Sequence, residues 1–332
     1  MKKLYAALGT LFISTSVFAG FAEGEKAFNS QQYSQAFSEF MPLADRGDFR
    51  AQYYIGYLYL NGYGITQNNE KALEYLNKSL KSNYDLPQAL MGYLYSEGTI
   101  VPKDKKLSME LYQKAADQGN ISALLNLGVS YYTGDGVTRN VSKAIEYFNK
   151  IPIPEKPVVG RYLGDIYSTE TNLVNYAKAF SYYFQSAKEN DLSAYHALGK
   201  MYQNGLGIDK NMIEAIKYYT YAASQNYAPS QYILGIIYAN GDGIPQDKYL
   251  GYAWLYLAAD KKVKGAEKAR NTLMESMSLS DIEKARRKLI EIQQLVIGKT
   301  TPPLNKTTET VAEEQEQQTI RQYERRIRRR RR

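Results

Sequence analysis

Residues that could perform covalent or metal chemistry are scarce in this chain. It contains no cysteine and a single histidine, His196. Nucleophilic catalysis usually needs an imidazole beside the nucleophile, and a zinc site needs several histidine, cysteine or carboxylate ligands that converge. The composition therefore predicts a protein with no enzymatic activity, no cofactor and no metal. The lack of cysteine also excludes a disulfide framework and a lipoprotein anchor.

Glycine-rich turns are the other feature that could suggest chemistry, because such loops can cradle phosphate. Four Gly-x-Gly-aliphatic segments occur, at Gly62–Ile65, Gly134–Val137, Gly205–Ile208 and Gly241–Ile244. None of them continues into the Gly-Lys-Ser/Thr ending of a phosphate-binding loop. They also recur with a fixed period, so we interpret them as turns at positive φ that end one helix and lead into the next.

The period is set by a glycine followed three residues later by a tyrosine. We call these residues the repeat glycine and the repeat tyrosine. The six pairs are Gly56/Tyr59, Gly92/Tyr95, Gly128/Tyr131, Gly164/Tyr167, Gly199/Tyr202 and Gly235/Tyr238, spaced by 36 residues with one step of 35. This period is typical of a solenoid, in which each repeat buries its apolar face only against its neighbours.

Each repeat is predicted to be a helical hairpin. The repeat glycine lies in the first helix, where it costs about 1 kcal/mol relative to alanine, so we expect it to permit close approach of a second helix. Aromatic pairs on the inner side of the second helix are the expected contacts: Tyr147/Phe148, Tyr182/Tyr183 and Tyr218/Tyr219. The fold class predicted is all-α, a right-handed α-solenoid superhelix of stacked helix-turn-helix repeats.

Two repeats depart from the pattern. The second has Ile100 where the second turn glycine is expected. The fourth has Glu170 and Asn172 in place of both glycines and is one residue shorter. We expect a reshaped turn in the fourth repeat, next to the prolines at 152, 154 and 157.

The motif Ala-x-x-x-Leu-Gly-x-x-Tyr-x-x-Gly-x-Gly-Val, followed by Lys-Ala-x-x-Tyr-Tyr-x-x-Ala-Ala, resembles the Sel1-like repeat, a longer relative of the tetratricopeptide repeat. Residues 123–148 and 194–223 carry it most fully. The resemblance implies six repeats over residues 51–262, preceded by a tetratricopeptide-like hairpin at 20–50. It implies a platform for protein interaction without catalysis, and bacterial members are associated with signalling, envelope regulation and contacts with host proteins.

The resemblance also indicates where a partner would bind. In tetratricopeptide-like stacks the first helices line the concave side, and the positions three before, one after and four after the repeat glycine point into it. We call these positions the first-helix face. The candidate partner-binding residues on it are Tyr53, Tyr57, Tyr93, Tyr132, Arg161, Asp165, His196, Lys200, Gln203 and Tyr232. Aromatic residues and arginine provide most hot spots, although ordinary solvent-exposed helix is an equal alternative for any one of them.

The first 19 residues predict a secretory signal peptide. Lys2 and Lys3 precede an apolar stretch and Val17-Phe18-Ala19, so cleavage is expected after Ala19, with an uncleaved anchor as the alternative. Residues 263–298 are predicted to form capping helices, with a capping box between Ser280 and Glu283. The predicted location is periplasmic or secreted.

Residues 299–332 predict a disordered linker and a basic tail, because they are poor in apolar residues. The basic residues are Arg321, Arg325, Arg326, Arg328, Arg329, Arg330, Arg331 and Arg332. These eight arginines and Glu324 carry +7 of the formal net charge of +8, so the repeats are close to neutral. Acidic phospholipid or lipopolysaccharide is the expected partner of the tail. A solvated tail with no partner is the alternative, and nucleic acid is disfavoured.

The functional prediction is a non-catalytic interaction scaffold of the bacterial cell envelope that binds a peptide or protein. A secreted factor that contacts host proteins is the first alternative. A hydrolase acting on envelope components is the second, and the scarcity of catalytic residues speaks against it.

Overall fold

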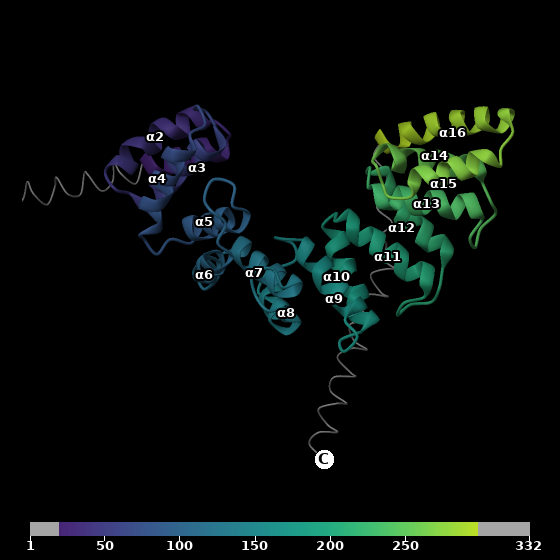
Figure 1. Ribbon diagram of the computed structural model, residues 1–332, viewed down its shortest axis with the longest axis horizontal. Coiled ribbons are helices and arrows are strands. Elements are labelled where there is room, and N and C mark those ends of the chain that lie inside the picture. Colours follow the sequence, from purple (N-terminus) through teal and green to yellow (C-terminus); the bar gives the residue numbers. More distant parts are fainter. Residues whose placement is uncertain (1–19, 298–332) are drawn as a thin grey trace, which may run out of the picture. The chain divides into compact units, whose positions relative to one another are not determined.

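The computed structural model describes residues 20–297, which are helical with connecting turns and contain no strand in that range. The chain forms two compact units, one ending at Lys150 and the other beginning at Ile151 (Figure 1). In the first unit, residues 20–29 are helical and are followed by α2 (Tyr33–Asp45), α3 (Phe49–Asn61), α4 (Asn69–Leu80), α5 (Asp85–Glu97), α6 (Lys105–Ala116), α7 (Ile121–Thr133) and α8 (Val141–Asn149). The second unit contains α9 (Val158–Thr169), α10 (Tyr176–Lys188), α11 (Leu192–Asn204), α12 (Met212–Ser224), α13 (Ala228–Asn240), α14 (Lys248–Asp260), α15 (Ala266–Glu275) and α16 (Leu279–Ile297).

Consecutive helices pack as hairpins, which confirms the predicted all-α solenoid class within each unit. Polar residues begin the second helices, because their side chains accept hydrogen bonds from backbone N–H groups of the first turn. Asn211, for example, accepts from Glu214 N at 3.1 Å. Glycine at positive φ ends most first helices, as at Gly205 with φ +69°.

A backbone hydrogen bond closes every hairpin turn. The carbonyl of the repeat tyrosine accepts from the N–H of the residue that caps the second helix, as between Tyr202 and Asn211 at 2.9 Å. The fourth repeat keeps this bond, between Tyr167 and Asn175 at 2.8 Å, although its turn is one residue shorter. Its first helix ends at Glu170 in an extended conformation rather than at a left-handed glycine. The turn is therefore reshaped, as predicted, while its closing bond is unchanged.

The two members of each aromatic pair have separate roles inside the hairpin. The first stacks on the repeat tyrosine, as Tyr147 does on Tyr131 with ring centroids 5.7 Å apart. The second packs on the repeat glycine: a Cβ added to Gly128 would lie 2.5 Å from Cε1 of Phe148. Gly199 faces Tyr219 in the same way. The predicted close approach at the repeat glycine is confirmed.

In the repeats that have a second turn glycine, this residue packs against the preceding hairpin. Gly207 (φ +72°) lies against the first residue of α10, where an added Cβ would be 2.6 Å from Cβ of Tyr176. Gly243 lies in the same way against Met212, the first residue of α12. Ile100 cannot make such an approach, and α5 contacts α4 less extensively than α7 contacts α6.

The second unit ends in a helical cap. Trp254 on α14 is 2% exposed and belongs to the core, as predicted. Helix α16 covers α14 (Figure 1). The predicted capping box is wrong by two residues: the N–H of Asp281 bonds the Ser278 hydroxyl at 3.2 Å, and the Asp281 carboxylate accepts from the N–H of Ser278 at 3.3 Å. The predicted signal peptide and basic tail lie outside the described residues.

Candidate binding site

The second unit contains a pocket of about 310 Å³ that brings together four of the predicted binding residues: Arg161, Asp165, His196 and Lys200. Arg161 and Asp165 come from α9, and His196 and Lys200 from α11, so each pair occupies equivalent positions of two successive repeats. The remaining lining residues are Ser168, Thr169, Tyr183, Ser193, Ala197, Met201, Leu206 and Tyr227.

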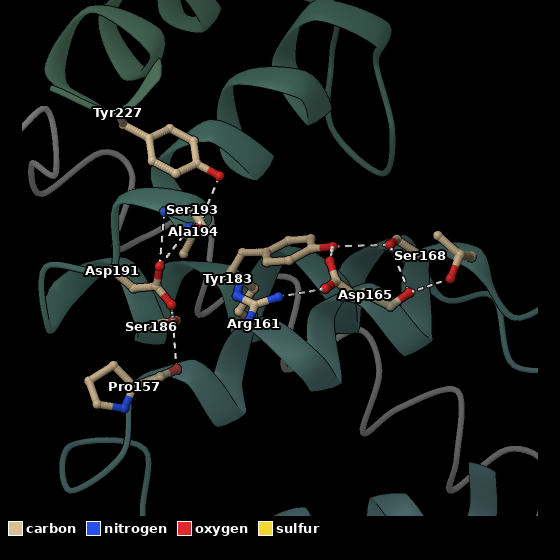
Figure 2. A network of polar contacts seen from close by, with 11 residues as sticks. Pro157, Arg161, Asp165, Ser168, Tyr183, Ser186, Asp191, Ser193, Ala194 and Tyr227 are labelled. Atoms are coloured by element: carbon tan, nitrogen blue, oxygen red, sulfur yellow. Dashed lines mark hydrogen bonds and ion pairs between the residues drawn. The ribbon is translucent and has the colours of Figure 1, made fainter. Parts of the chain in front are cut away.

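Asp165 is the centre of the polar network on the α9 side of the pocket (Figure 2). One carboxylate oxygen accepts from the Tyr183 hydroxyl at 2.7 Å, and the other accepts from Arg161 at 3.2 Å. The Ser168 and Tyr183 hydroxyl oxygens are 3.1 Å apart. Burial raises the pKa of Asp165 above its ordinary value, although the Tyr183 hydrogen bond and the Arg161 charge oppose the rise. The charges of Arg161 and Asp165 are thus largely committed to each other.

A second set of contacts fixes the start of α11. Asp191 caps the helix by accepting from the N–H groups of Ser193 and Ala194 (Figure 2). Ser186 Oγ lies 2.7 Å from the carbonyl oxygen of Pro157 and 3.0 Å from the Asp191 carboxylate. These bonds connect α9, α10 and α11, and therefore hold the pocket walls in register.

His196 is less exposed than the sequence suggested. The variability of its position predicted an exposed helix face, but the ring is half-buried, with centroids 5.2 Å from Tyr219 and 5.7 Å from Tyr227. Its Nδ1 lies 2.9 Å from Ser230 Oγ. Burial lowers the pKa of His196 to about 4, and the positive charge of Lys200 contributes to the shift. The imidazole is therefore neutral at pH 7.

The contact between His196 and Ser230 does not form a nucleophile in the pocket. Ser230 is fully buried and does not line the pocket. Its hydroxyl satisfies a ring nitrogen in the core, and a substrate in the pocket would not reach it.

Lys200 is the cation of the pocket without an opposing charge. Among the described residues, its ammonium has no ion pair or hydrogen-bond partner, and the side chain is exposed. Tyr227 accepts from the Ser193 hydroxyl at 3.1 Å, which leaves its own proton free to be donated. The groups with unused capacity are thus mainly donors.

Two predicted residues of the second unit lie elsewhere. Gln203 accepts from the Tyr219 hydroxyl at 2.8 Å. Tyr232 lines a different pocket, near Gly265 and Lys268. Neither reaches the group around Asp165.

Two of the predicted aromatic residues of the first unit, Tyr53 and Tyr57, form a ring cluster instead of a pocket. Tyr53 and Tyr57 contact each other and their neighbours Tyr63 and Tyr84 through ring contacts of 5.9–6.2 Å. Both are partly buried. Tyr93 is 50% exposed. Tyr132 has the Arg139 guanidinium over its ring at 5.7 Å.

Sequence reasoning missed Tyr183 and Tyr227 as pocket residues. Tyr183 belongs to a second helix, and its position predicted only packing on Gly164, which it also provides. Tyr227 caps α13 without a side-chain hydrogen bond, and its position, eight residues before the repeat glycine, is not part of the motif, although Tyr84 holds the equivalent position before α5. The available signals were that Asp165 and Lys200 are the charged residues directly after a repeat glycine, and that a tyrosine stands eight residues before the repeat glycine in the second and sixth repeats.

Neither a metal-binding group nor a membrane-spanning helix is found among residues 20–297. No group of three histidine, cysteine or carboxylate side chains there could hold a metal ion. None of the helices in that range has the length and apolarity needed to cross a membrane.

These features define a helical-repeat scaffold with a polar pocket on its first helices. The Sel1 repeat model matches residues 49–84, 88–120, 121–151, 162–191, 192–227 and 228–263, which is more than half of the chain. The chain belongs to the Sel1 repeat family, and the six predicted repeats are confirmed.

Comparison with known proteins supports the same assignment. An uncharacterized protein of Neisseria meningitidis serogroup B is 28% identical over 52% of this chain, and the match spans 35% of that relative's length. The structure of a Sel1 repeat protein from Oxalobacter formigenes has a TM-score of 0.54 and 26% identity, covering 82% of this chain and 99% of that chain. A protective antigen of uropathogenic Escherichia coli that displays an SLR fold has a TM-score of 0.59 at 23% identity, over 88% and 71% of the two chains, and shows the fold alone. Sel1 repeats build scaffolds for protein–protein interaction, and the coarse functional class follows.

Proposed function

We propose that this chain is a non-catalytic scaffold of the bacterial envelope that binds a partner protein through the first-helix face, with the pocket of the second unit as the principal site. The observation that carries the proposal is the convergence of Arg161, Asp165, His196 and Lys200 on one pocket. These four residues were selected by their positions in the repeat, and in the structure they line the same cavity.

The pocket is better suited to recognition than to turnover. Its imidazole has a pKa of about 4, too low for an efficient base at pH 7, and the hydroxyl bonded to it is buried. The rigid network around Asp165 instead offers a fixed arrangement of donors and acceptors, and a preorganised surface loses less entropy when it binds.

Filling the pocket tests this proposal without changing its charge. Ala197→Phe places a large side chain in the cavity and should abolish capture of an envelope protein by the purified chain, as measured by quantitative affinity pull-down. Gln185→Phe, at an exposed position of α10 outside the pocket, is the matched control and should capture normally. Equal capture by the two variants with unchanged circular dichroism would remove the pocket from the binding site.

Export is the second element of the proposal, and its support is the sequence of residues 1–19. Expression in a Gram-negative host followed by fractionation and intact-mass measurement tests it. A periplasmic or secreted product beginning at Gly20 is expected, and a cytoplasmic product retaining Met1 would contradict it. A contact with host proteins is the alternative use of an exported scaffold.

A separate electrostatic contact is proposed for the basic tail, because eight arginines fall within the last twelve residues. A basic residue near an acidic membrane contributes about 1 kcal/mol, which suffices here for reversible adhesion. Co-sedimentation with acidic liposomes or lipopolysaccharide should be strong at low salt, weak at high salt and absent for a chain ending at Thr319. Equal sedimentation of both chains would exclude this role.

A further inference from the structure

The pocket of the second unit has a net charge and a size that together restrict its ligand. At neutral pH, Arg161 and Lys200 are positive, Asp165 is the one carboxylate that lines the cavity, and His196 is neutral. Since Arg161 is paired with Asp165, one unit of positive charge is left, on Lys200. A monoanion would balance it.

The hydrogen-bonding capacity left over points to the same class of ligand. Asp165 already accepts from Tyr183 and Arg161, and the Ser168 and Thr169 hydroxyls both bond the Asp165 carbonyl. The Lys200 ammonium and the proton of Tyr227 remain unused among the described residues. These are donors, and they select an acceptor.

Size and charge favour a carboxylate over a phosphate. The cavity of about 310 Å³ is at the lower limit for small-molecule sites and suits one protruding side chain. A phosphate dianion would need a second free cation and would lie near the Asp165 carboxylate, which repels it. A single carboxylate needs only Lys200. The apolar side chains of Ala197, Met201 and Leu206 can cover the methylene groups beneath it.

We propose that this pocket binds the carboxylate of an aspartate or glutamate side chain on the partner protein, with Lys200 as counter-ion and Tyr227 as hydrogen-bond donor. This inference rests on the proposed binding function and adds the chemistry of the group that is recognised. Asp165 is the positioning residue, because it pairs with Arg161, and Tyr183 donates a hydrogen bond to Asp165.

Defined peptides test the inference without the natural partner. The probe is acetyl-Ala-Ala-Glu-Ala-Ala-amide, and the comparison peptide carries glutamine in place of glutamate. Methyl NMR of the full chain labelled at methionine reports where they bind, because Met201 lines the pocket and Met91 lies in the core of the first unit. The glutamate peptide should shift the Met201 signal in a saturable manner, and the glutamine peptide should bind at least about tenfold more weakly, since a hydrogen bond to a charged group is lost. Met91 should not respond.

Two variants locate the charge. Lys200→Gln should weaken the glutamate peptide about tenfold and leave the glutamine peptide unchanged. Lys210→Gln removes an exposed lysine of the same repeat that does not line the pocket, and it should bind like the parent chain. Both substitutions are at exposed positions, so the Met201 spectrum of the free chain verifies that each variant folds.

Three results would overturn the inference: equal affinity for the two peptides, equal loss in the two lysine variants, or displacement of the peptide by inorganic phosphate at concentrations where acetate has no effect. The last would identify a phosphate site. If the peptide binds as expected but Ala197→Phe still captures the natural partner, the carboxylate pocket stands and the proposed use of it fails. If Ala197→Phe abolishes capture and neither peptide binds, the scaffold function stands and the proposed chemistry fails.

Discussion

The first repeat holds aromatic rings at positions where the fourth repeat holds charged groups. Tyr53 and Tyr57 stand three residues before and one after the first repeat glycine, where the fourth repeat has Arg161 and Asp165. In the first unit these rings pack on one another, and in the second the charged groups pair across one turn of helix and border a pocket. The same backbone positions therefore contribute to a ring cluster in one unit and border the proposed binding pocket in the other.

The difference shows which residues of a repeat are constrained by folding. The repeat glycine contacts the second helix in both units, at Phe148 for Gly128 and at Tyr219 for Gly199. The residues around it on the first-helix face differ between the units while the contact at the repeat glycine is kept, so their chemistry can change without loss of the hairpin. Binding specificity can accordingly differ along one chain.

The largest expected loss of stability comes from disrupting the contact at the repeat glycine, which both units share. Gly128→Leu in the first unit and Gly199→Leu in the second should each lower the free energy of unfolding by about 1–3 kcal/mol or more, because the new side chain overlaps an aromatic ring. Chemical denaturation measures the loss. Ser122→Leu, at an exposed position of α7, is the control and should change stability by less than about 0.5 kcal/mol. A Gly128→Leu chain as stable as its control would mean that the helices of that hairpin are not in close contact.

The second-largest effect is expected from removing a tyrosine hydroxyl, which should lower stability in the second unit but not in the first. Tyr183→Phe keeps the ring but removes a donor from Asp165, and we expect a loss of about 1–3 kcal/mol because the half-buried carboxylate loses a partner. Tyr57→Phe should change stability by less than about 0.5 kcal/mol, since that residue contributes its ring. Denaturation of the two variants under identical conditions provides the comparison. Equal effects would show that the polar network of the second unit is no more important than the rings of the first.

The smallest expected effect on stability comes from mild acid, through protonation of His196. The pKa of His196 is about 4 in the folded chain and 6.5 for an exposed histidine, so the unfolded chain takes up the proton first as the pH falls. Stability is therefore lost between pH 6.5 and about 4, and we expect a loss of about 1–2 kcal/mol between pH 7 and pH 5. His196→Gln should reduce this dependence when denaturation is repeated at both values. An identical loss in parent and variant would assign the acid sensitivity to other groups.

The hairpin architecture could be predicted because its determinants are local and repeated. Gly128, Tyr131 and the pair Tyr147/Phe148 belong to one hairpin, and their spacing determines which of them meet. The signal is strengthened by six occurrences in one sequence. Even the reshaped turn at Glu170 was predictable from the missing glycines.

The pocket was only partly predictable. Arg161 and Lys200 could be chosen from the repeat register, but Tyr227 comes from the cap of a later helix, and its approach to Ser193 depends on how successive repeats stack. His196 was misjudged because its burial comes from Tyr219 and Tyr227, two residues of other helices. Contacts between repeats can keep a fixed spacing, as Gly207–Tyr176 and Gly243–Met212 do, but the side chains at these positions change from repeat to repeat, so the motif does not reveal which of them are buried.

The bond that closes each hairpin has a consequence for the evolution of the chain. It joins the carbonyl of Tyr167 to the N–H of Asn175 across eight positions, and that of Tyr202 to Asn211 across nine. Only main-chain atoms take part, so substitution of either side chain leaves the bond possible, except for proline at the capping residue, which has no N–H to donate. The fourth repeat shows that the loop can also be one residue shorter while the bond is kept. These turns are therefore sites where a longer binding loop could be inserted, by natural insertion or by design, while the helices keep their register.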